Sequence, residues 1–397
     1  MPNRRPDPTP LLTGERQRLL KDILSQPTAP FREAHVQRCV IAHLQRAGVP
    51  FFEDPAGNLV VGAESRAAYA RLLREKSDQP VRLFIAHMDH PGFHGLRWLA
   101  NDRLAVKWLG GSPLRYLAGA RVWLSDGETV LGEGRLRNVR LLKQGWAMDR
   151  AEVQTEAGLV RCRAAKRLYG GFQFRADCWY SGKRVYARAI DDLAGVFAIV
   201  STAIDLFRRR KPGPPPFLGL LTRAEEVGFV GAVRHFELGW LASRRRPLVA
   251  VSLEASRNLP GARIGKGPIV RLGDRRTTFD PGGMHLLSGL AEKLLPGRHQ
   301  RRIMDGGSCE ATAATAWGIP TIGLTLPLGN YHNQCFDGGM DCPRAQGPAP
   351  EFVHLDDVDG LLRLCRGLLR PGLKWQAPWA DTQGRLRRNA QRFKGYT

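Results

Sequence analysis

The sequence lacks the features that would mark a secreted or membrane-bound protein. Its seven cysteines include no Cys-x-x-Cys pair, so neither a zinc ribbon nor a disulfide framework is indicated, and a reducing compartment fits this usage. No hydrophobic run approaches the length of a membrane-spanning helix, and the N-terminus lacks the apolar core of a signal peptide. These absences predict a cytoplasmic protein with no membrane partner.

Acidic residues are scarce relative to basic ones. The chain has 37 Asp and Glu against 60 Lys and Arg, which gives a formal net charge of +23 at pH 7. Such an excess can indicate a nucleic-acid partner. The basic residues, however, are mostly arginines spread over the chain, and no segment interleaves arginine with aromatic residues. We therefore expect a basic surface on an enzyme, with only weak electrostatic binding of nucleic acid.

The 397-residue chain is long enough for a large core and about two domains. A proline-rich tail, predicted to be loose, covers residues 1–10. Strand and helix patterns alternate in 1–94 and again in 188–370, whereas 95–187 contains short β-like segments separated by Gly, Asp and Ser. This predicts an α/β catalytic domain in two parts, interrupted by a small inserted β-rich domain. A basic tail, either solvated or used in interactions, follows at 371–397.

The spacing of apolar residues predicts individual elements of the catalytic part. The predicted helices cover 11–24, 32–47, 67–76 and 193–210, and the predicted strands cover 59–61, 81–86, 217–221, 248–253 and 319–326. Within the insertion, β-like segments lie at 103–106, 121–124 and 129–131. No internal repeat is visible.

Side chains able to bind metals recur at the ends of these elements. Glu225 and Glu226 follow the strand at 217–221, and an isolated Glu-Glu pair would ordinarily be a solvated loop feature. The arrangement repeats, however, at three more strand ends and one helix start, with the residues His87, Glu254, His332 and Asp191. Because open α/β sheets bind ligands beyond the carboxyl ends of their strands, we expect these side chains to converge.

The residue types favour a two-metal hydrolase site. Imidazole and carboxylate groups are ligands of zinc and its neighbours, and the two metals of such hydrolases lie about 3.5–4 Å apart. Asp191 is best placed to bridge the metals, with Asp192 as its rival. The predicted ligand set is His87, Asp191 and Glu254 on one metal and Asp191, Glu226 and His332 on the other.

Two further residues are assigned to catalysis. Glu225 would remain unligated and take the proton from the water that the metals activate. Asp89, two residues after His87, can orient that imidazole from behind. Each residue alone has a simpler interpretation, such as a helix cap for Asp191. Their ordered appearance at element ends is what favours the metal site.

Several of these segments resemble the tetrahedral aminopeptidase family of dinuclear metallopeptidases, also called glutamyl aminopeptidases and formerly "cellulase M". The matching motifs are His87-Met88-Asp89, Arg188-Ala189-Ile190-Asp191-Asp192-Leu193-Ala194-Gly195, Glu225-Glu226-Val227-Gly228, Gly265-Lys266-Gly267-Pro268, Tyr331-His332 and an Asp-x-x-Gly-Asn-Leu turn at 54–59. The similarity spans roughly residues 11–365.

The resemblance implies a phosphorylase/hydrolase-like α/β fold, in which helices flank a central mixed sheet and a small barrel-like all-β lid domain is inserted. It also implies two divalent metal ions, zinc or in its place cobalt or manganese. The implied substrates are peptides that lose their N-terminal residues, and the implied assembly is a homo-oligomer. Carried onto the matching positions, the family's ligands are His87, Asp191, Glu226 and His332, and its base is Glu225.

The chain departs from the family pattern at several positions. Glu254 stands where the family usually has Asp, and His90 replaces a Glu after His-Met-Asp. A Gly-Ser-Cys-Glu-Ala segment at 307–311 replaces Gly-Gly-Thr-Asp-Ala, and Asn330 and Asn333 flank His332. None of these departures removes a ligand, but they bear on substrate preference and assembly.

The sequence therefore predicts a metallo-aminopeptidase that acts on short peptides. One alternative is a metal-dependent deacylase or amidohydrolase with the same metal core, acting on N-acyl amino acids. An alternative of another class is an inactive basic binding protein that retains the fold. The complete set of five ligands and Glu225 argues against the inactive protein, because a binding module has no need of them together. An insertion before Asp191, rather than after the Glu-Glu pair, separates the chain from aminoacylase-like and carboxypeptidase-like relatives.

Overall fold

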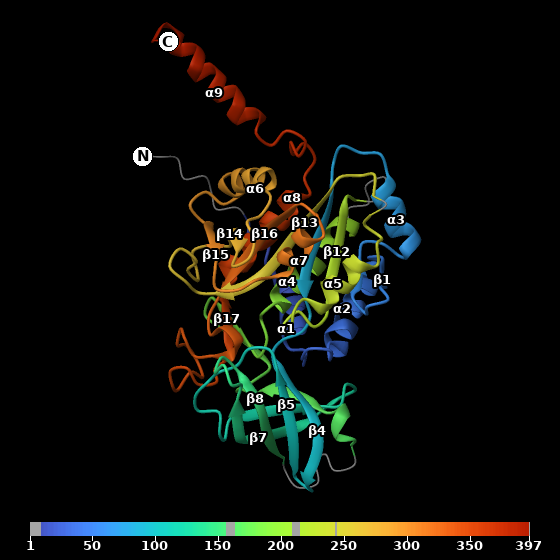
Figure 1. The fold of residues 1–397 in the computed structure, drawn as a ribbon, viewed down its shortest axis with the longest axis vertical. Coiled ribbons are helices and arrows are strands. Elements are labelled where there is room, and N and C mark those ends of the chain that lie inside the picture. Colours follow the sequence, from blue (N-terminus) through green and yellow to red (C-terminus); the bar gives the residue numbers. More distant parts are fainter. Residues whose placement is uncertain (1–8, 156–162, 209–214, 243, 397) are drawn as a thin grey trace.

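The computed structural model describes residues 9–155, 163–208, 215–242 and 244–396. The predicted loose tail at 1–10 therefore lies almost wholly outside the described residues, as do the last two positions of the helix predicted at 193–210. An α/β body and a β-barrel follow one another along the long axis of the molecule (Figure 1). The C-terminal helix α9 projects from the end of the α/β body that lies away from the barrel (Figure 1).

An eight-stranded mixed sheet forms the centre of the α/β body, in the order β1-β2-β12-β3-β13-β16-β14-β15. Its strands are β1 (Phe51–Glu53), β2 (Leu59–Val61), β3 (Val81–His87), β12 (Phe217–Thr222), β13 (Leu248–Arg257), β14 (Ile269–Asp274), β15 (Gln300–Met304) and β16 (Thr321–Leu328). The four central strands β12, β3, β13 and β16 run parallel to one another. Their carboxyl ends therefore share one edge of the sheet.

Helices cover both faces of this sheet because successive side chains of each strand point to opposite sides. On β3, Phe84 and Ala86 enter one buried cluster, whereas Leu83 and Ile85 enter the other. The first face is covered by α1 (Gly14–Leu24), α2 (Ala34–Ala47), α4 (Leu193–Arg208), α6 (Pro281–Leu294) and α8 (Leu355–Leu368). The second face is covered by α3 (Arg66–Arg74), α5 (Val230–Glu237) and α7 (Glu310–Ala316).

Local sequence signals explain where these helices begin and how deeply they lie. Asp280 caps α6, since its Oδ2 accepts a hydrogen bond of 2.6 Å from the main-chain N–H of Gly283, and Pro281 occupies the first helical position. In α4 every residue from Leu193 to Ala203 is buried. A helix that is apolar on all sides belongs in the interior, and α4 packs between the sheet and the outer helices α1 and α8.

Six antiparallel strands close into the barrel, in the order β4-β5-β8-β7-β6-β9. They are β4 (Gly92–Ala100), β5 (Arg103–Leu109), β6 (Arg121–Ser125), β7 (Val130–Leu141), β8 (Met148–Thr155) and β9 (Tyr169–Phe172), with the short helix η1 (Ala165–Arg167) before β9. Alternate residues of β5, namely Leu104, Val106 and Trp108, are buried and fill the barrel. A separate three-stranded sheet joins β10 (Cys178–Ser181), β11 (Arg184–Ala187) and β17 (Glu351–His354).

The predicted fold class, a central mixed sheet flanked by helices with a small β-barrel, is confirmed. None of the described strands between Gly92 and Ala187 joins the central sheet. The barrel strands run from Gly92 to Phe172, whereas the insertion was predicted at 95–187. The barrel therefore begins three residues before the predicted start and ends well before the predicted end. The remaining strands of that segment lie outside the barrel, where β10 pairs with β11 and β11 pairs with β17.

Two features differ from the expectations drawn from the sequence. Cys335 and Cys342 form a disulfide, because the loop after β16 turns back and brings their Cα atoms to 5.6 Å. The basic tail, for which the sequence predicted no helix, contains α9 (Ala380–Arg392), followed by a short 3-10 helix, η3 (Lys394–Tyr396). Among the described ranges, no helix combines the length and the apolar character needed to cross a membrane.

Candidate metal centre

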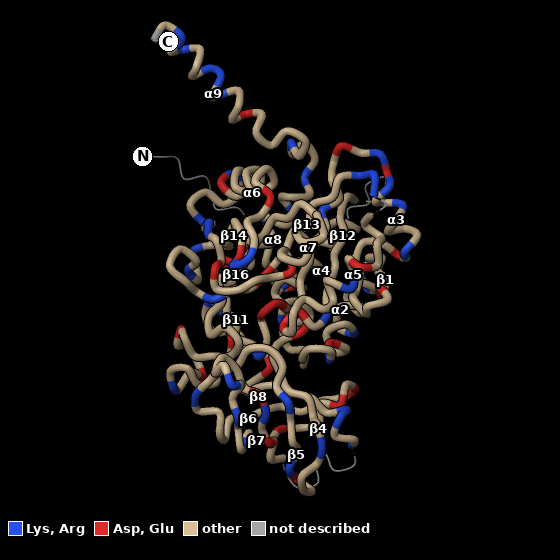
Figure 2. The backbone as a smooth tube through the Cα atoms, viewed as in Figure 1, with Lys and Arg blue, Asp and Glu red and all other residues tan. Residues whose placement is uncertain are grey.

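The six predicted metal-site and base residues meet where the carboxyl edge of the sheet faces the barrel, and acidic residues gather there in Figure 2. His87 ends β3, Glu225 and Glu226 follow β12, and Glu254 lies in the last half of β13. His332 lies in the short helix η2 (Tyr331–Asn333) after β16, and Asp191 precedes α4. The parallel strands thus deliver side chains from distant parts of the chain to one edge.

Asp191 lies between the two imidazoles. Its Oδ1 is 3.5 Å from Nε2 of His87, and its Oδ2 is 3.6 Å from Nε2 of His332. Oε1 of Glu226 also approaches this Nε2 of His332, at 3.2 Å. One carboxylate therefore faces both histidines, which is the arrangement that a bridging ligand requires.

Asp192, the rival for the bridging position, has a different partner. Its Oδ1 accepts a hydrogen bond of 3.1 Å from the main-chain N–H of Gly195 in the first turn of α4. A Cβ at Gly195 would overlap the Asp192 carboxylate, so the glycine in this motif leaves room for the capping side chain. The geometry favours Asp191 as the bridge and Asp192 as the helix cap.

Three groups of side chains can each hold a cation, with all ligand atoms of a group within 4.8 Å of one another. These groups are His87 with Asp191 and Glu254, Asp191 with Glu226 and His332, and His87 with Glu225 and Glu226. The first two share Asp191 and together contain the five predicted ligands. The third contains Glu225, so this predicted base lies within ligand distance of the same centre.

The pKa values of the site residues show how strongly negative charge is concentrated there. Burial would lower the pKa of His332, but the carboxylates of Glu226 and Asp191 outweigh it and raise that pKa to about 10. Burial raises the pKa of Glu254 well above its ordinary value, and the nearby Asp191 carboxylate adds to the effect. Buried carboxylates crowded in this way repel one another unless a positive charge lies between them.

Buried polar atoms without hydrogen-bond partners also indicate a cation site. Oδ1 of Asp191, Oε1 of Glu226 and Nε2 of His332 are buried and have no hydrogen-bond partner among the described residues. Buried polar atoms without partners are rare, and each calls for an explanation. Divalent ions fit this set, since imidazole nitrogen and carboxylate oxygen are ligands for zinc and its neighbours. The assignment of the five residues as ligands stays a prediction.

Asp89 differs from its predicted use. Nδ1 of His87 lies 3.0 Å from the main-chain oxygen of Asp89 and 3.7 Å from the carboxylate, so the main chain orients the imidazole. The carboxylate instead accepts hydrogen bonds from the main-chain N–H groups of Glu225, at 2.9 Å, and Glu226, at 3.2 Å. Asp89 therefore fixes the two glutamates to the end of β3.

Two buried glutamates that the sequence analysis missed hold the site from behind. Oε2 of Glu351 accepts hydrogen bonds from the main-chain N–H groups of Ile190, at 2.7 Å, and Asp191, at 3.1 Å, and its Oε1 accepts one of 2.8 Å from His332. Glu33 accepts a hydrogen bond of 3.0 Å from the main-chain N–H of Ala224. For Glu351 a signal was available, because a single charge interrupts an apolar run at 349–353.

His90, one of the departures from the family pattern, is buried next to Asp191. Its Nδ1 is 3.0 Å from the main-chain oxygen of Asp191, and its Nε2 is 3.2 Å from Oδ1 of Asn333. Asn333 in turn donates a hydrogen bond of 2.9 Å to the main-chain oxygen of Arg188. Two of the departures, His90 and Asn333, are thus partners in one network.

The backbone is strained where it carries the site residues. Ala224, which precedes the glutamate pair, has a φ of 53°, and His332 has a φ of 55°. A non-glycine residue held in the left-handed region costs about 1–3 kcal/mol and persists only when its surroundings fix it. The hydrogen bonds from Ala224 to Glu33 and from His332 to Glu351 supply that support.

The barrel closes over the site through the loop after β5. Trp108 donates a hydrogen bond of 2.8 Å from Nε1 to the main-chain oxygen of Gly111, which holds this loop in place. A Cβ at Gly111 would overlap the imidazole of His332, so the main chain lies directly against that ring. The glycine is required here by the close approach of the two parts of the molecule.

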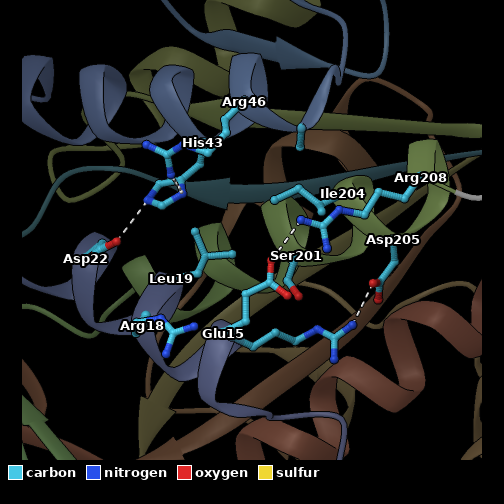
Figure 3. A pocket seen from close by; sticks show the side chains of 12 residues that line it. Glu15, Arg18, Leu19, Asp22, His43, Arg46, Ser201, Ile204, Asp205 and Arg208 are labelled. Carbon is cyan, nitrogen blue, oxygen red and sulfur yellow. Dashed lines mark hydrogen bonds and ion pairs between the residues drawn. The ribbon is translucent and has the colours of Figure 1, made fainter.

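A second concave region lies apart from this centre, between α1, α2 and α4 (Figure 3). Its volume is about 320 Å³. Three ion pairs line it: Arg16–Asp205 at 2.7 Å, Arg208–Glu15 at 2.9 Å and His43–Asp22 at 3.2 Å. Because most of its charged groups pair with one another, this region has the character of a helix–helix contact and not of a catalytic site.

Comparison with known proteins adds to this description. The family model of M42 glutamyl aminopeptidases matches residues 68–336. A search of curated proteins gives no significant match. Solved structures of several archaeal peptidases are similar in fold, at sequence identities of 20% or less.

Three of these structures cover nearly the whole chain. The TET1 peptidase of Pyrococcus horikoshii, which can assemble into a tetrahedron or a large octahedral shell, is 20% identical, with a TM-score of 0.67 over 90% of this chain and 99% of that one. A TET aminopeptidase from a marine sediment archaeon of the Thaumarchaeota is 17% identical, with a TM-score of 0.70 over 92% and 99%. An aminopeptidase from Desulfurococcus kamchatkensis is 18% identical, with a TM-score of 0.69 over 91% and 96%.

Proposed function

The chain belongs to the M42 glutamyl aminopeptidase family and is a metal-dependent peptide hydrolase, and from this premise we propose that two divalent ions, held by the candidate metal centre, serve to remove N-terminal residues from short peptides. The proposed ligands are His87, Asp191, Glu226, Glu254 and His332. The observation that carries the proposal is the position of Asp191, with one carboxylate oxygen toward each imidazole.

The bound metals would supply an activated water and a polarised carbonyl at the scissile bond. Glu225 has the part of general base, taking the proton from the attacking water and passing it to the leaving amine. Asp89 holds Glu225 through its main-chain N–H, which keeps the base in place during the reaction. The barrel loop at Gly111 covers His332 and limits the access of bulk water.

We infer that zinc is the resident metal, because two imidazoles and three carboxylates form a ligand set that zinc favours. Cobalt or manganese would bind the same set. We also propose that the chain forms a homo-oligomer and acts in the cytoplasm. The similar peptidase from Pyrococcus horikoshii can assemble into a tetrahedron or a large octahedral shell, and light scattering would test the oligomer of this chain as a multiple of 44.1 kDa.

A substrate screen tests the reaction. Aminoacyl-nitroanilides and N-acyl amino acids would be offered to the protein with added zinc, cobalt or manganese, and again after a chelator. Release of nitroaniline that the chelator abolishes and the metal restores is the expected result. Hydrolysis of N-acyl amino acids alone would favour the deacylase, which has the same metal core. No hydrolysis with any metal would favour a binding protein that retains the fold.

Elemental analysis tests the metal centre separately from activity. We expect up to two divalent ions per chain, with fewer in His87→Ala and in His332→Ala. A matched control is His299→Ala, because His299 lies outside the site and its Nδ1 is 2.9 Å from the main-chain oxygen of Leu295. If both site variants kept the stoichiometry of the parent, the metals would have to lie elsewhere.

A further inference from the structure

The C-terminal helix α9 leaves the α/β body and points away from it (Figure 1). Its first turn is anchored on α6, where the ring of Trp379 stacks on His285 at a centroid distance of 4.0 Å and Thr382 lies 3.2 Å from Nε2 of the same histidine. Beyond this anchor every residue from Arg385 to Gly395 is exposed. The helix is therefore presented to the surroundings and does not pack on the body.

One side of α9 is apolar. Trp379, Leu386 and Phe393 follow one another at intervals of seven residues, which is close to two helical turns, so they lie on the same side. Ala390 falls between the last two. Leu386 is 59% exposed and Phe393 is 47% exposed, so the stripe presents large apolar side chains to solvent. Exposed apolar stripes of this kind mark contact surfaces.

The other sides of α9 are basic. Five cations, Arg385, Arg387, Arg388, Arg392 and Lys394, follow Asp381, and no acidic residue stands between Thr382 and the C-terminus. Asp381 itself pairs with Lys374 at 2.7 Å. Figure 2 shows the resulting run of positive residues along the helix. The projecting segment therefore combines an apolar stripe with a single sign of charge.

The helix is too short to depend on its own hydrogen bonds. Isolated helices shorter than about 12–15 residues are marginal in water. α9 has 13 residues, and none of them, all being described, is buried. Gly384 in its interior lowers helix stability further, by about 1 kcal/mol relative to alanine. A surface that covers the apolar stripe would supply the missing stabilisation.

Three kinds of partner can be compared with this surface. Pairing with the α9 of a second copy would bring two runs of arginine together, and like charges repel. A nucleic acid would attract the arginines but leave the apolar stripe in water. The surface of an anionic bilayer uses both features, since its headgroups attract arginine while Leu386 and Phe393 enter the boundary with the acyl chains.

We propose that α9 docks the protein on the surface of anionic phospholipid bilayers. The helix lies in the plane of the interface, with Leu386 and Phe393 toward the acyl chains and the arginines among the headgroups. This inference concerns where the protein acts and does not depend on the proposed peptidase reaction. It differs from the expectation of no membrane partner, which rested on the absence of a spanning segment.

Vesicle sedimentation of the full-length protein tests the proposal. Vesicles of phosphatidylglycerol and phosphatidylcholine would be compared with vesicles of phosphatidylcholine alone. We expect binding to the anionic vesicles only, weaker at high salt, and about tenfold weaker in a Leu386→Gln/Phe393→Gln variant. The matched control is Leu96→Gln/Leu99→Gln on the barrel, where both leucines are 39% exposed, and this control should bind like the parent.

A charge variant separates the two contributions. Arg385→Gln/Arg388→Gln keeps the apolar stripe and should weaken binding while flattening its dependence on salt. Equal binding by the parent and the Leu386→Gln/Phe393→Gln variant would overturn the proposal, because the general basic surface would then account for the attraction.

Two further outcomes would also overturn it. A lower oligomer mass of the Leu386→Gln/Phe393→Gln variant in light scattering, with vesicle binding unchanged, would assign α9 to a second copy. Loss of binding to a DNA duplex in the α9 variants, with vesicle binding unchanged, would assign the helix to nucleic acid.

Discussion

Asp89 shows how one side chain can set the roles of two neighbours. Its two carboxylate oxygens each accept a hydrogen bond from one member of the Glu225–Glu226 pair. Glu225 and Glu226 lie in the turn after β12, and holding the main chain of both residues there fixes the directions in which their side chains leave it. Glu226 lies against His332, at 3.2 Å, whereas Glu225 lies toward His87, at 3.9 Å. The two glutamates should therefore respond differently to the same substitution.

We predict that Glu225→Gln folds, retains its metals and binds substrate, while kcat falls by about 10²–10⁴-fold because the basic oxygen is lost. Glu226→Gln should also lower metal occupancy, because it weakens a proposed ligand. Steady-state kinetics together with elemental analysis of both variants make the comparison. A near-normal kcat for Glu225→Gln would exclude it as the base, and loss of metal in that variant would exchange the two roles.

A pH-dependent contribution to stability is expected from Asp54, in the turn before β2. Its carboxylate accepts hydrogen bonds from the main chain of Ala56, at 2.8 Å, from the side chain of Asn58, at 2.8 Å, and from His235, at 2.7 Å. Burial raises the pKa of Asp54, but the hydrogen bonds from His235 and Asn58 outweigh it and hold that pKa below its ordinary value. The folded protein therefore binds this proton less readily than the unfolded chain does.

The stability that Asp54 contributes is thus fully present above the unfolded pKa of about 3.9 and is lost as the pH falls through the lower, folded value. We expect Asp54→Asn to destabilise the protein by about 1–3 kcal/mol at pH 7 and by less below pH 4. Thermal denaturation at several pH values measures the difference, with the exposed Asp78→Asn as control. A difference that stays constant with pH would contradict the assignment.

Single residues differ in how far the sequence can predict their use. His87, Glu225 and Glu254 were found because each stands at the end of an apolar strand, and that pattern is local. Glu351 acts on residues about 160 positions away in the sequence, at Ile190 and Asp191. Glu33 acts over a similar range, on Ala224. No local pattern encodes such contacts, since they exist only after the sheet has formed.

At the level of elements, the loop after β5 should be sensitive to the smallest added side chain. We predict that Gly111→Ala lowers both metal occupancy and kcat/KM, by about 10–100-fold, because the methyl group would displace the imidazole of His332 or the loop itself. The matched control is Gly289→Ala in α6, where nothing lies within 4 Å of the added methyl group. Unchanged kinetics in Gly111→Ala would mean that the barrel loop does not rest on the site in solution.

Elements with strong periodicity were predicted closely, and weakly patterned ones were not. The apolar strand at 81–86 appears as β3 (Val81–His87), and the helix at 67–76 appears as α3 (Arg66–Arg74). The helix α9 was missed, because Arg and Gln between Trp379 and Phe393 obscure the seven-residue spacing of its few apolar residues. The pairing of β11 with β17 joins segments far apart in sequence, so no turn pattern indicates it.

For the whole molecule, the net charge of +23 predicts a salt-dependent attraction to polyanions without sequence recognition. Binding to a DNA duplex, followed by fluorescence anisotropy, should be measurable at about 50 mM salt and fall on the order of a thousandfold by about 200 mM. The affinity should not change with the DNA sequence. Tight binding that persists at physiological salt would instead favour the binding-protein alternative.

The two connections between the α/β body and the barrel have a mechanical consequence. The chain leaves the body just after His87, at β4 (Gly92–Ala100), and returns through β11 (Arg184–Ala187) just before Asp191. Both crossings thus begin or end next to a proposed ligand, and the stacking of Arg188 on Trp123, at 5.2 Å, stiffens the return. Both connections are short, and both lie next to the candidate metal centre. A tilt of the barrel on its two connections would therefore displace the segments that carry His87 and Asp191 together, and with them both proposed ligands.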